Sequence, residues 1–283
     1  MIAPLLFAIS LMSIGTGPRQ TVSIRDLQAL EMSSGGRLGV FALDTHSGKT
    51  LSYRKNERFL MCSTYKLFVV ANILKNCDEG KEDLDSAISY SKADLVDYSP
   101  VTSAHVAKGS LPISTLCEAA MEVSDNTAAN LLLARLGGPA KVTHFLRSLG
   151  DRTTRCDRNE PTVNDPHGNL DTTTPRAMSR TAQRILLSSE LQPASLEKLD
   201  NWMKNCSSGL QRLRAGFPSD WISADKTGTG SGYVNDVVIV TPPGRQPIVI
   251  AAFYEAPNIE FDKRQAVLAQ VGSIVAKWAA SQN

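Results

Sequence analysis

Ser63-Thr64-Tyr65-Lys66 starts the stretch that decides the fold of this 283-residue chain, because it places a hydroxyl and an ammonium one helical turn apart. The apolar residues that follow have the spacing of one helix face: Leu67, Val70, Ile73 and Leu74. We therefore predict a helix that begins at Ser63 and carries Lys66 on the same face. A serine becomes a good nucleophile when a base takes its proton, and a lysine can be that base once burial or nearby cations lower its pKa.

The same spacing of serine and lysine also occurs at residues 52–55, 89–92, 195–198 and 223–226, so this pattern alone identifies nothing. Two further strings occur once each, Ser124-Asp125-Asn126 and then Lys226-Thr227-Gly228. Each has an ordinary explanation as well, since serine and aspartate are common helix N-caps. Chance would rarely place all three strings in this order.

In this order the three strings are the signature of class A β-lactamases and penicillin-binding proteins. The chain resembles class A β-lactamases over nearly its whole length after the first twenty residues. Arg158-Asn159-Glu160-Pro161-Thr162-Val163-Asn164 resembles the start of the family's Ω-loop, and Asp171-Thr172-Thr173-Thr174-Pro175 resembles its closing segment. The stretch between them is about two residues shorter than is usual in the family. This departure concerns the shape of the pocket and leaves its chemistry intact.

The resemblance implies an acyl-enzyme on Ser63 and hydrolysis of the β-lactam amide bond. The implied catalytic residues are Ser63, Lys66, Ser124, Glu160 and Asn164. Ser124 would pass a proton to the departing ring nitrogen, and Glu160 would activate the deacylating water. Whether Glu160 or Lys66 is the base for acylation stays open. The backbone N–H groups of Ser63 and Thr229 would form the oxyanion hole.

The resemblance also implies a set of substrate-binding residues: Asn126, Lys226, Thr227, Gly228, Thr229, Arg212 and Tyr98. Arg212 would reach the substrate carboxylate from beneath the strand, because Asn235 stands where other family members have the alternative arginine. Arg158 and Asp171 would form the ion pair at the neck of the Ω-loop. A solvated surface charge is the simpler interpretation of Arg158, Glu160 and Arg212 taken singly.

Two other functions stay open, and penicillin-binding proteins share the first three motifs. A penicillin-binding peptidase would lack the pair Glu160 and Asn164 and would stay acylated by the drug. A β-lactam-sensing module would be acylated and would only signal, but such modules normally follow membrane segments. No cofactor or metal is expected, because His46, His105, His144 and His167 have no zinc-ligand spacing.

Composition agrees with a secreted enzyme, and the resemblance implies small-molecule β-lactam substrates. A formal net charge of +2 and scattered Lys and Arg residues argue against nucleic-acid binding. Residues 2–15 are apolar and precede Thr16, Gly17 and Pro18, so residues 1–20 are predicted to be a signal peptide, with a buried N-terminal helix as the alternative. We expect a monomer without a membrane anchor in the periplasm of a Gram-negative bacterium.

The predicted fold class is α/β (α+β), with an antiparallel sheet flanked by N- and C-terminal helices and an inserted all-helical domain. Ser23 and Asp26 cap a helix that ends at Gly35-Gly36, and strands follow at residues 37–44 and 50–53. Helical periodicity continues from residue 62 to about 207, and strands return at 237–241 and 248–255 before a closing helix. The sheet domain would therefore comprise residues 21–60 and 208–283. The helical domain would comprise residues 61–207, with the active site where the two meet.

The five cysteines form an odd set, so at least one has no partner within the chain: Cys62, Cys77, Cys117, Cys156 and Cys206. In some carbapenem-hydrolysing relatives, a cysteine at the position of Cys62 is bridged to one that follows the K-T-G-T string. Gly230 occupies that second position here, so Cys62 is predicted to be a buried free thiol. No disulfide pair is assigned.

Overall fold

The computed structural model describes residues 24–282. The predicted signal peptide and the predicted cap at Ser23 lie outside these residues. The first helix, α1 (Ile24–Ser34), ends as expected before two glycines with positive φ, Gly35 at 73° and Gly36 at 71°. Glycine adopts this left-handed backbone without the steric cost of a Cβ atom.

A five-stranded antiparallel sheet forms the centre of one half of the molecule, in the order β2-β1-β9-β8-β7. Its strands are β1 (Arg37–Asp44), β2 (Thr50–Tyr53), β7 (Ile222–Gly230), β8 (Tyr233–Thr241) and β9 (Ile248–Glu255). The predicted bounds of β1, β2 and β9 are confirmed. β8 begins earlier than predicted, because Gly232, with φ of 82°, closes a tight turn that pairs Gly230 with Tyr233.

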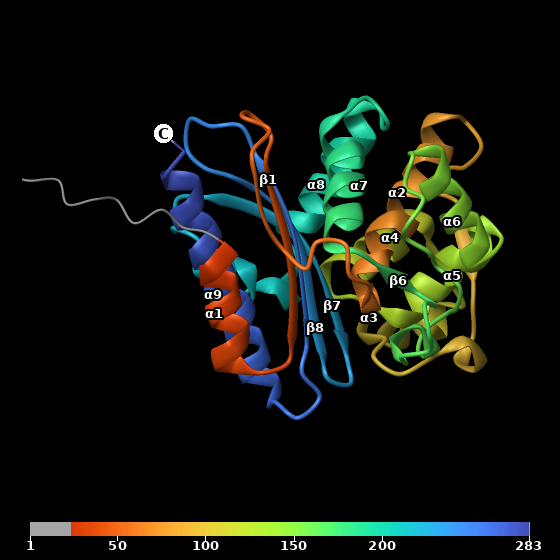
Figure 1. Ribbon diagram of the computed structural model, residues 1–283. Coiled ribbons are helices and arrows are strands. Elements are labelled where there is room, and N and C mark those ends of the chain that lie inside the picture. The colour runs from red at the N-terminus through yellow and green to blue at the C-terminus, as the bar shows by residue number, and fades with distance from the viewer. Residues whose placement is uncertain (1–23, 283) are drawn as a thin grey trace, which may run out of the picture.

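The central strands are buried along nearly their whole length because helices cover both faces of the sheet. One face packs against α1 and the closing helix α9 (Phe261–Ala280), which lie side by side in Figure 1. α9 places Val267, Val271, Val275 and Trp278 in that core, as its periodicity predicts.

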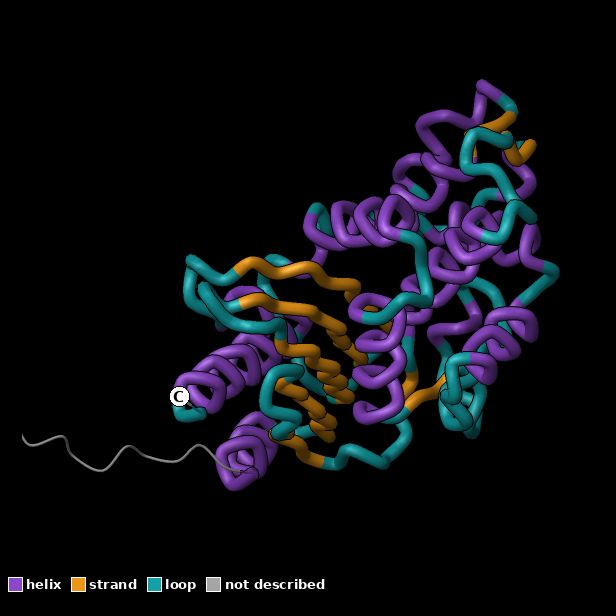
Figure 2. Tube along the Cα trace, turned by 90° about the horizontal axis from the view of Figure 1, so that it is seen from above, coloured by secondary structure: helices purple, strands orange, loops and turns teal. Residues whose placement is uncertain are grey.

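The other helices lie on the opposite side of the sheet, as the views in Figures 1 and 2 show. They are α2 (Lys66–Asp78), α3 (Pro100–His105), α4 (Ile113–Glu122), α5 (Asn126–Leu136), α6 (Pro139–Ser148), α7 (Pro175–Leu187) and α8 (Pro193–Lys204). α6 and α7 begin at the predicted prolines, and the hydroxyl of Thr174 caps α7 by accepting from the N–H of Ala177. α2 is the core of this group, with every residue buried from Lys66 to Leu74.

Two short antiparallel pairs lie outside the main sheet, and three of their four strands fall within residues 62–207, for which the periodicity predicts helices. β3 (Phe59–Leu60) pairs with β6 (Thr172–Thr173), and β4 (Ala87–Ser89) pairs with β5 (Ser110–Pro112). The first pair joins the chain just before Ser63 to the end of the Ω-loop. We propose that the chain consists of a sheet domain and a helical domain, although the two share one hydrophobic cluster that includes Phe68 and Phe253.

No helix in the described part of the chain is long and apolar enough to cross a membrane.

Candidate active site

Ser63 lies in a turn of 3-10 helix, Cys62–Tyr65, directly before α2. The prediction that the α-helix itself begins at Ser63 is therefore wrong by one turn. Tight 3-10 turns are common where α-helices start. Cys62 has φ of 45°, in the left-handed region, so the backbone changes direction immediately before Ser63. Ser63 lines a cavity, and Lys66 does not.

Lys66 is completely buried and surrounded by oxygen atoms. Its Nζ donates to Asn126 Oδ1 at 2.5 Å and to the carbonyl of Ser124 at 2.8 Å, and it lies 3.1 Å from Glu160 Oε1. Burial lowers the pKa of the ammonium, while the Glu160 carboxylate opposes that shift. Lys66 thus has the environment that the sequence argument requires of a lysine base.

Glu160 contacts the proposed nucleophile directly. Ser63 Oγ donates to Glu160 Oε1 at 3.2 Å, and Asn164 Nδ2 donates to Glu160 Oε2 at 2.6 Å. The backbone of Glu160 is held by Asn130, whose Oδ1 accepts from its N–H and whose Nδ2 donates to its carbonyl. Sequence reasoning missed Asn130. The sequence signal that could have identified Asn130 is its position four residues after Asn126, because residues four apart lie on the same face of a helix.

The neck of the Ω-loop is closed by the predicted ion pair between Arg158 and Asp171. Arg158 Nε lies 2.6 Å from Asp171 Oδ2, and Asp171 Oδ1 accepts the N–H groups of Asp157 and Arg158. The peptide bond between Glu160 and Pro161 is cis. Because the Asp171 carboxylate is fully buried, these contacts position the loop that carries Glu160.

Ser124 lies between two lysine side chains. Its Oγ accepts from Lys226 Nζ at 3.1 Å and from Lys66 Nζ at 3.4 Å. The next residue, Asp125, is the N-cap of α5 and accepts from the N–H of Ala128. The capping interpretation of this motif is therefore confirmed for Asp125, and it leaves the hydroxyl of Ser124 free to face the cavity.

Strand β7 passes very close to the segment before Ser63. A Cβ atom at Gly228 would lie only 2.5 Å from the carbonyl oxygen of Met61, so glycine is required there. This close approach brings Thr229 to the same cavity as Ser63. Thr227 also lines it, with Oγ1 2.6 Å from Ser208 Oγ.

Arg212 is buried against β7 and β8 and lines the cavity. Its Nη1 donates to the carbonyls of Gly228 and Asn235, and its Nη2 donates to Thr229 Oγ1 at 2.7 Å. The side chain of Asn235 donates instead to the backbone carbonyls of Leu60 and Met61. Of the two alternative positions, Arg212 is therefore the one with a charge at this cavity.

The cavity has a volume of about 540 Å³. It is lined by the predicted residues Ser63, Tyr98, Ser124, Asn126, Asn164, Arg212, Thr227 and Thr229. Lys66, Glu160, Lys226 and Gly228 are absent from that lining. The first three contact lining residues instead: Lys66 contacts Asn126, Glu160 contacts Ser63, and Lys226 contacts Ser124. Sequence reasoning missed Leu210, Phe261 and Gln265 in the wall. Tyr98 is 63% exposed at the rim, and its φ of 59° is unusual for a residue other than glycine.

Cys62 is a fully buried free thiol, as predicted, and the other four cysteines are free as well. Burial raises the pKa of the Cys62 thiol, so it is a weak nucleophile. A Cβ atom at Gly230 would lie 2.9 Å from Cys62 Sγ. The two positions are therefore adjacent, although only one is a cysteine.

We expect a thiol reductant to leave the activity of the protein almost unchanged, because no disulfide supports the site. Hydrolysis rates with and without reductant measure this. The variant Gly230→Cys provides the matched control, since a bridge to Cys62 would then form and become sensitive to reductant. A disulfide mapped from Cys62 to any native cysteine would contradict the prediction.

Glu160 contacts both Ser63 and Lys66, so contacts within hydrogen-bonding reach join the nucleophile to the two candidate bases. This arrangement defines a serine enzyme that transfers acyl groups. The chain belongs to the beta-lactamase enzyme family, whose family model matches residues 23–279. Its relatives and structural neighbours place it among the class A serine β-lactamases.

Three comparisons illustrate this membership. Beta-lactamase CTX-M-8 of Citrobacter amalonaticus is 42% identical over 88% of this chain and 86% of its own length. The carbapenem-hydrolyzing beta-lactamase KPC of Klebsiella oxytoca is 43% identical over 85% of this chain and 83% of its own. A crystal structure of a beta lactamase from Burkholderia vietnamiensis is 46% identical with a TM-score of 0.91, covering 96% of this chain and all of the other (100%).

Proposed function

We propose that this class A β-lactamase opens the lactam ring through an ester on Ser63. Ser63 Oγ attacks the lactam carbonyl carbon while its proton passes to Glu160, whose carboxylate is 3.2 Å away. The backbone N–H groups of Ser63 and Thr229 stabilise the oxyanion that forms on the carbonyl oxygen. The C–N bond then breaks, and Ser124 supplies the proton that the ring nitrogen takes up. Lys66, whose Nζ is 3.4 Å from Ser124 Oγ, restores that proton. Lys66 then takes up the proton that Glu160 received from Ser63, because the two side chains are 3.1 Å apart, and Glu160 is a carboxylate again.

Deacylation uses the same carboxylate a second time. Glu160 takes a proton from a water molecule while the water oxygen attacks the ester carbonyl. As the ester bond breaks, Glu160 gives that proton to Ser63 Oγ, which leaves as the hydroxyl. Asn164, which donates to Glu160 Oε2, orients this carboxylate. The contact between Glu160 and Ser63 is the observation that carries the proposal, because a base at this place permits turnover that an acylated peptidase or sensor lacks.

Mass spectrometry of the intact protein tests the proposal directly. After mixing with excess simple penicillin, the protein should return to its unmodified mass once the penicillin is hydrolysed. Protein that stays stoichiometrically acylated for hours would overturn the hydrolase proposal and favour the peptidase or the sensor.

We expect Arg212→Ala to lower kcat/KM for an ordinary penicillin by about 10- to 150-fold. Arg212 would donate a charged hydrogen bond to the substrate carboxylate, and such bonds contribute about 1.5 to 3 kcal/mol. The decrease in kcat/KM should be much smaller for a penicillin whose carboxylate is esterified, because that substrate already lacks the interaction with Arg212. Steady-state kinetics of both proteins with both substrates measure the difference.

The backbone contacts of Arg212 make the esterified substrate an essential control. Its Nη1 holds the carbonyls of Gly228 and Asn235, so the substitution could also loosen β7 against β8. Such a structural effect would lower kcat/KM equally for acid and ester. Equal decreases in kcat/KM for the acid and the ester would show that Arg212 does not bind the substrate carboxylate.

The pH dependence of kcat/KM should have an alkaline limb near pH 8. Burial lowers the pKa of the Lys226 ammonium to about 8. Below that pH the ammonium is charged and attracts the substrate carboxylate, and the attraction is lost as the pH rises through about 8. The profile of kcat/KM reports groups of the free enzyme, so it measures this titration.

Lys226→Arg separates this group from other titrating groups. A guanidinium stays charged to much higher pH, so the alkaline limb should move upward in the variant. If the alkaline limb stays at the same pH in the variant, it arises from another group, such as Lys66, whose pKa is also lowered by burial.

We further propose that the protein acts as a monomer in the periplasm of a Gram-negative bacterium and confers β-lactam resistance there. The apolar residues 2–15 and the Gram-negative sources of the relatives support this location. Cell fractionation of a bacterium that expresses the full chain tests the location, and sedimentation tests the oligomeric state.

A further inference from the structure

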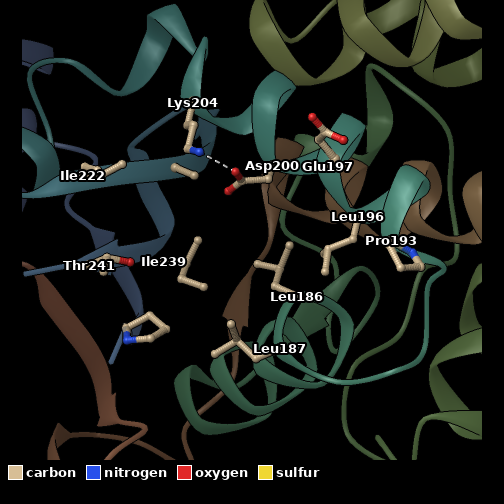
Figure 3. Close-up of a pocket in the computed structure, with 12 residues that line it drawn as sticks. Leu186, Leu187, Pro193, Leu196, Glu197, Asp200, Lys204, Ile222, Ile239 and Thr241 are labelled. Carbon is tan, nitrogen blue, oxygen red and sulfur yellow. Dashed lines mark ion pairs between the residues drawn. The ribbon is translucent and has the colours of Figure 1, made fainter. Parts of the chain in front are cut away.

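A second cavity, of about 510 Å³, lies between the sheet and two helices, away from Ser63. Figure 3 shows its walls, which come from the ends of β7 and β8 and from α7 and α8. None of its lining residues lines the active-site cavity. Its volume falls within the range of about 300–1,000 Å³ that is typical of small-molecule sites.

The sheet wall consists of two neighbouring cross-strand pairs on one face. Ile222 pairs with Thr241, and Ala224 pairs with Ile239. Because side chains alternate along a strand, these four residues point to the same side. Ala224 and Ile239 are buried in the main hydrophobic cluster, whereas Ile222 is 62% exposed at the end of the wall.

The helix wall is also apolar. Leu186 and Leu187 come from the last turn of α7, and Leu196 comes from α8, facing the sheet residues across the cavity (Figure 3). Leu187 is 40% exposed. Large aliphatic side chains left partly exposed around one hollow mark a surface that can bury an apolar ligand.

The polar edge of the cavity carries a net negative charge. Asp200 and Lys204 form an ion pair at 2.5 Å, drawn as the dashed line in Figure 3, so their charges offset each other. The side chain of Glu197, on the same helix, has no ion pair or hydrogen bond with any residue in the part of the chain that the structure describes. One carboxylate at the apolar cavity is therefore left without a protein cation.

We propose that this cavity binds a small amphiphilic cation, an apolar chain or ring system that carries a single ammonium group. The apolar part lies between the sheet wall and the helix wall and covers Ile222 and Leu187. The ammonium pairs with Glu197 at the edge. The ligand rests against the first residues of β7, the strand whose later residues, Lys226 to Thr229, belong to the active site.

Titration calorimetry at pH 7 with decylammonium and decanoate below their critical micelle concentrations, and with decanol below its solubility limit, tests the proposal. The three probes share one chain and differ only in the head group. Decylammonium should bind with a stoichiometry of one and more tightly than decanoate or decanol. Binding of decanoate in preference, or no saturable binding of decylammonium, would overturn the proposal.

The site is located with Ile222→Ala, which should weaken decylammonium binding by about 3- to 30-fold because part of the buried apolar surface is lost. Ile24→Ala is the matched control, since Ile24 is an exposed isoleucine on α1 outside the cavity. Equal affinities for the two variants would reject this site. Weaker binding in Phe261→Ala instead would place the amine in the active-site cavity.

The head-group contact is tested with Glu197→Gln. Exposed ion pairs are weak, so the affinity for decylammonium should fall by about 2- to 5-fold, while that for decanol stays the same. Asp85→Asn removes an exposed carboxylate elsewhere and should change neither affinity. An unchanged decylammonium affinity in Glu197→Gln would contradict the assigned orientation of the ligand.

Discussion

Replacing Ser63 by alanine is expected to abolish covalent labelling by penicillin and to lower kcat on the order of 10⁶-fold, as removal of a serine nucleophile does in other hydrolases. The reason is that no ester can form without Ser63 Oγ. The remaining residues of the cavity can still bind the drug, so the variant should bind penicillin without turning it over. Intact mass and steady-state kinetics measure the two effects.

Ser89→Ala is the matched control for this experiment. Ser89 and Lys92 repeat the spacing of Ser63 and Lys66, but Ser89 lies exposed on the short strand β4. This variant should be labelled and should turn over penicillin as the native protein does. Labelling that persists in Ser63→Ala would show that another residue is the nucleophile.

Glu160→Asn should separate the two halves of the reaction. We expect turnover to fall by about 10²- to 10⁴-fold, the range for loss of a general base, while an acyl-enzyme becomes detectable by intact mass. Lys66 stays beside Ser63 on the chain and can still assist acylation in this variant. Deacylation has lost the carboxylate that activates water, so the ester accumulates.

Glu122→Gln provides the corresponding control. Glu122 and Asn126 repeat the spacing of Glu160 and Asn164, but Glu122 Oε1 accepts from Asn205 in an exposed hydrogen bond. The Glu122→Gln variant should turn over penicillin at close to the rate of the native protein. A Glu160→Asn protein that is never acylated would instead make Glu160 essential for the first half-reaction and would leave no role for Lys66 as an alternative base.

The predicted bounds that the structure confirms belong to elements with strong local signals. α6 and α7 begin at prolines, α1 ends before two glycines, and β1 and β2 flank a turn at Gly48 with φ of 71°. Such signals act over a few residues and need no distant partner. The short pairs β3 with β6 and β4 with β5 have no comparable local signal, because each forms only when remote segments meet.

The same distinction separates two groups of site residues. The motif strings single out Ser63, Ser124, Glu160 and Lys226, although these residues are far apart in the chain. Asn130, Leu210 and Phe261 carry no motif, and they become visible only because the folded chain places them around Glu160 or in the cavity wall.

The sequence by itself determined the family, the order of the main helices and strands, and the residue types that the chemistry needs, because periodicity, capping and motif spacing are properties of short segments. The tertiary structure alone decided which of these residues touch. Ser63 and Glu160 are 97 residues apart, and Ser124 and Lys226 are 102 apart, yet each pair is within hydrogen-bonding distance. Those contacts, the burial that lowers the pKa of Lys66 and the second cavity between β7 and α8 depend on the path of the whole chain. No short segment contains that information.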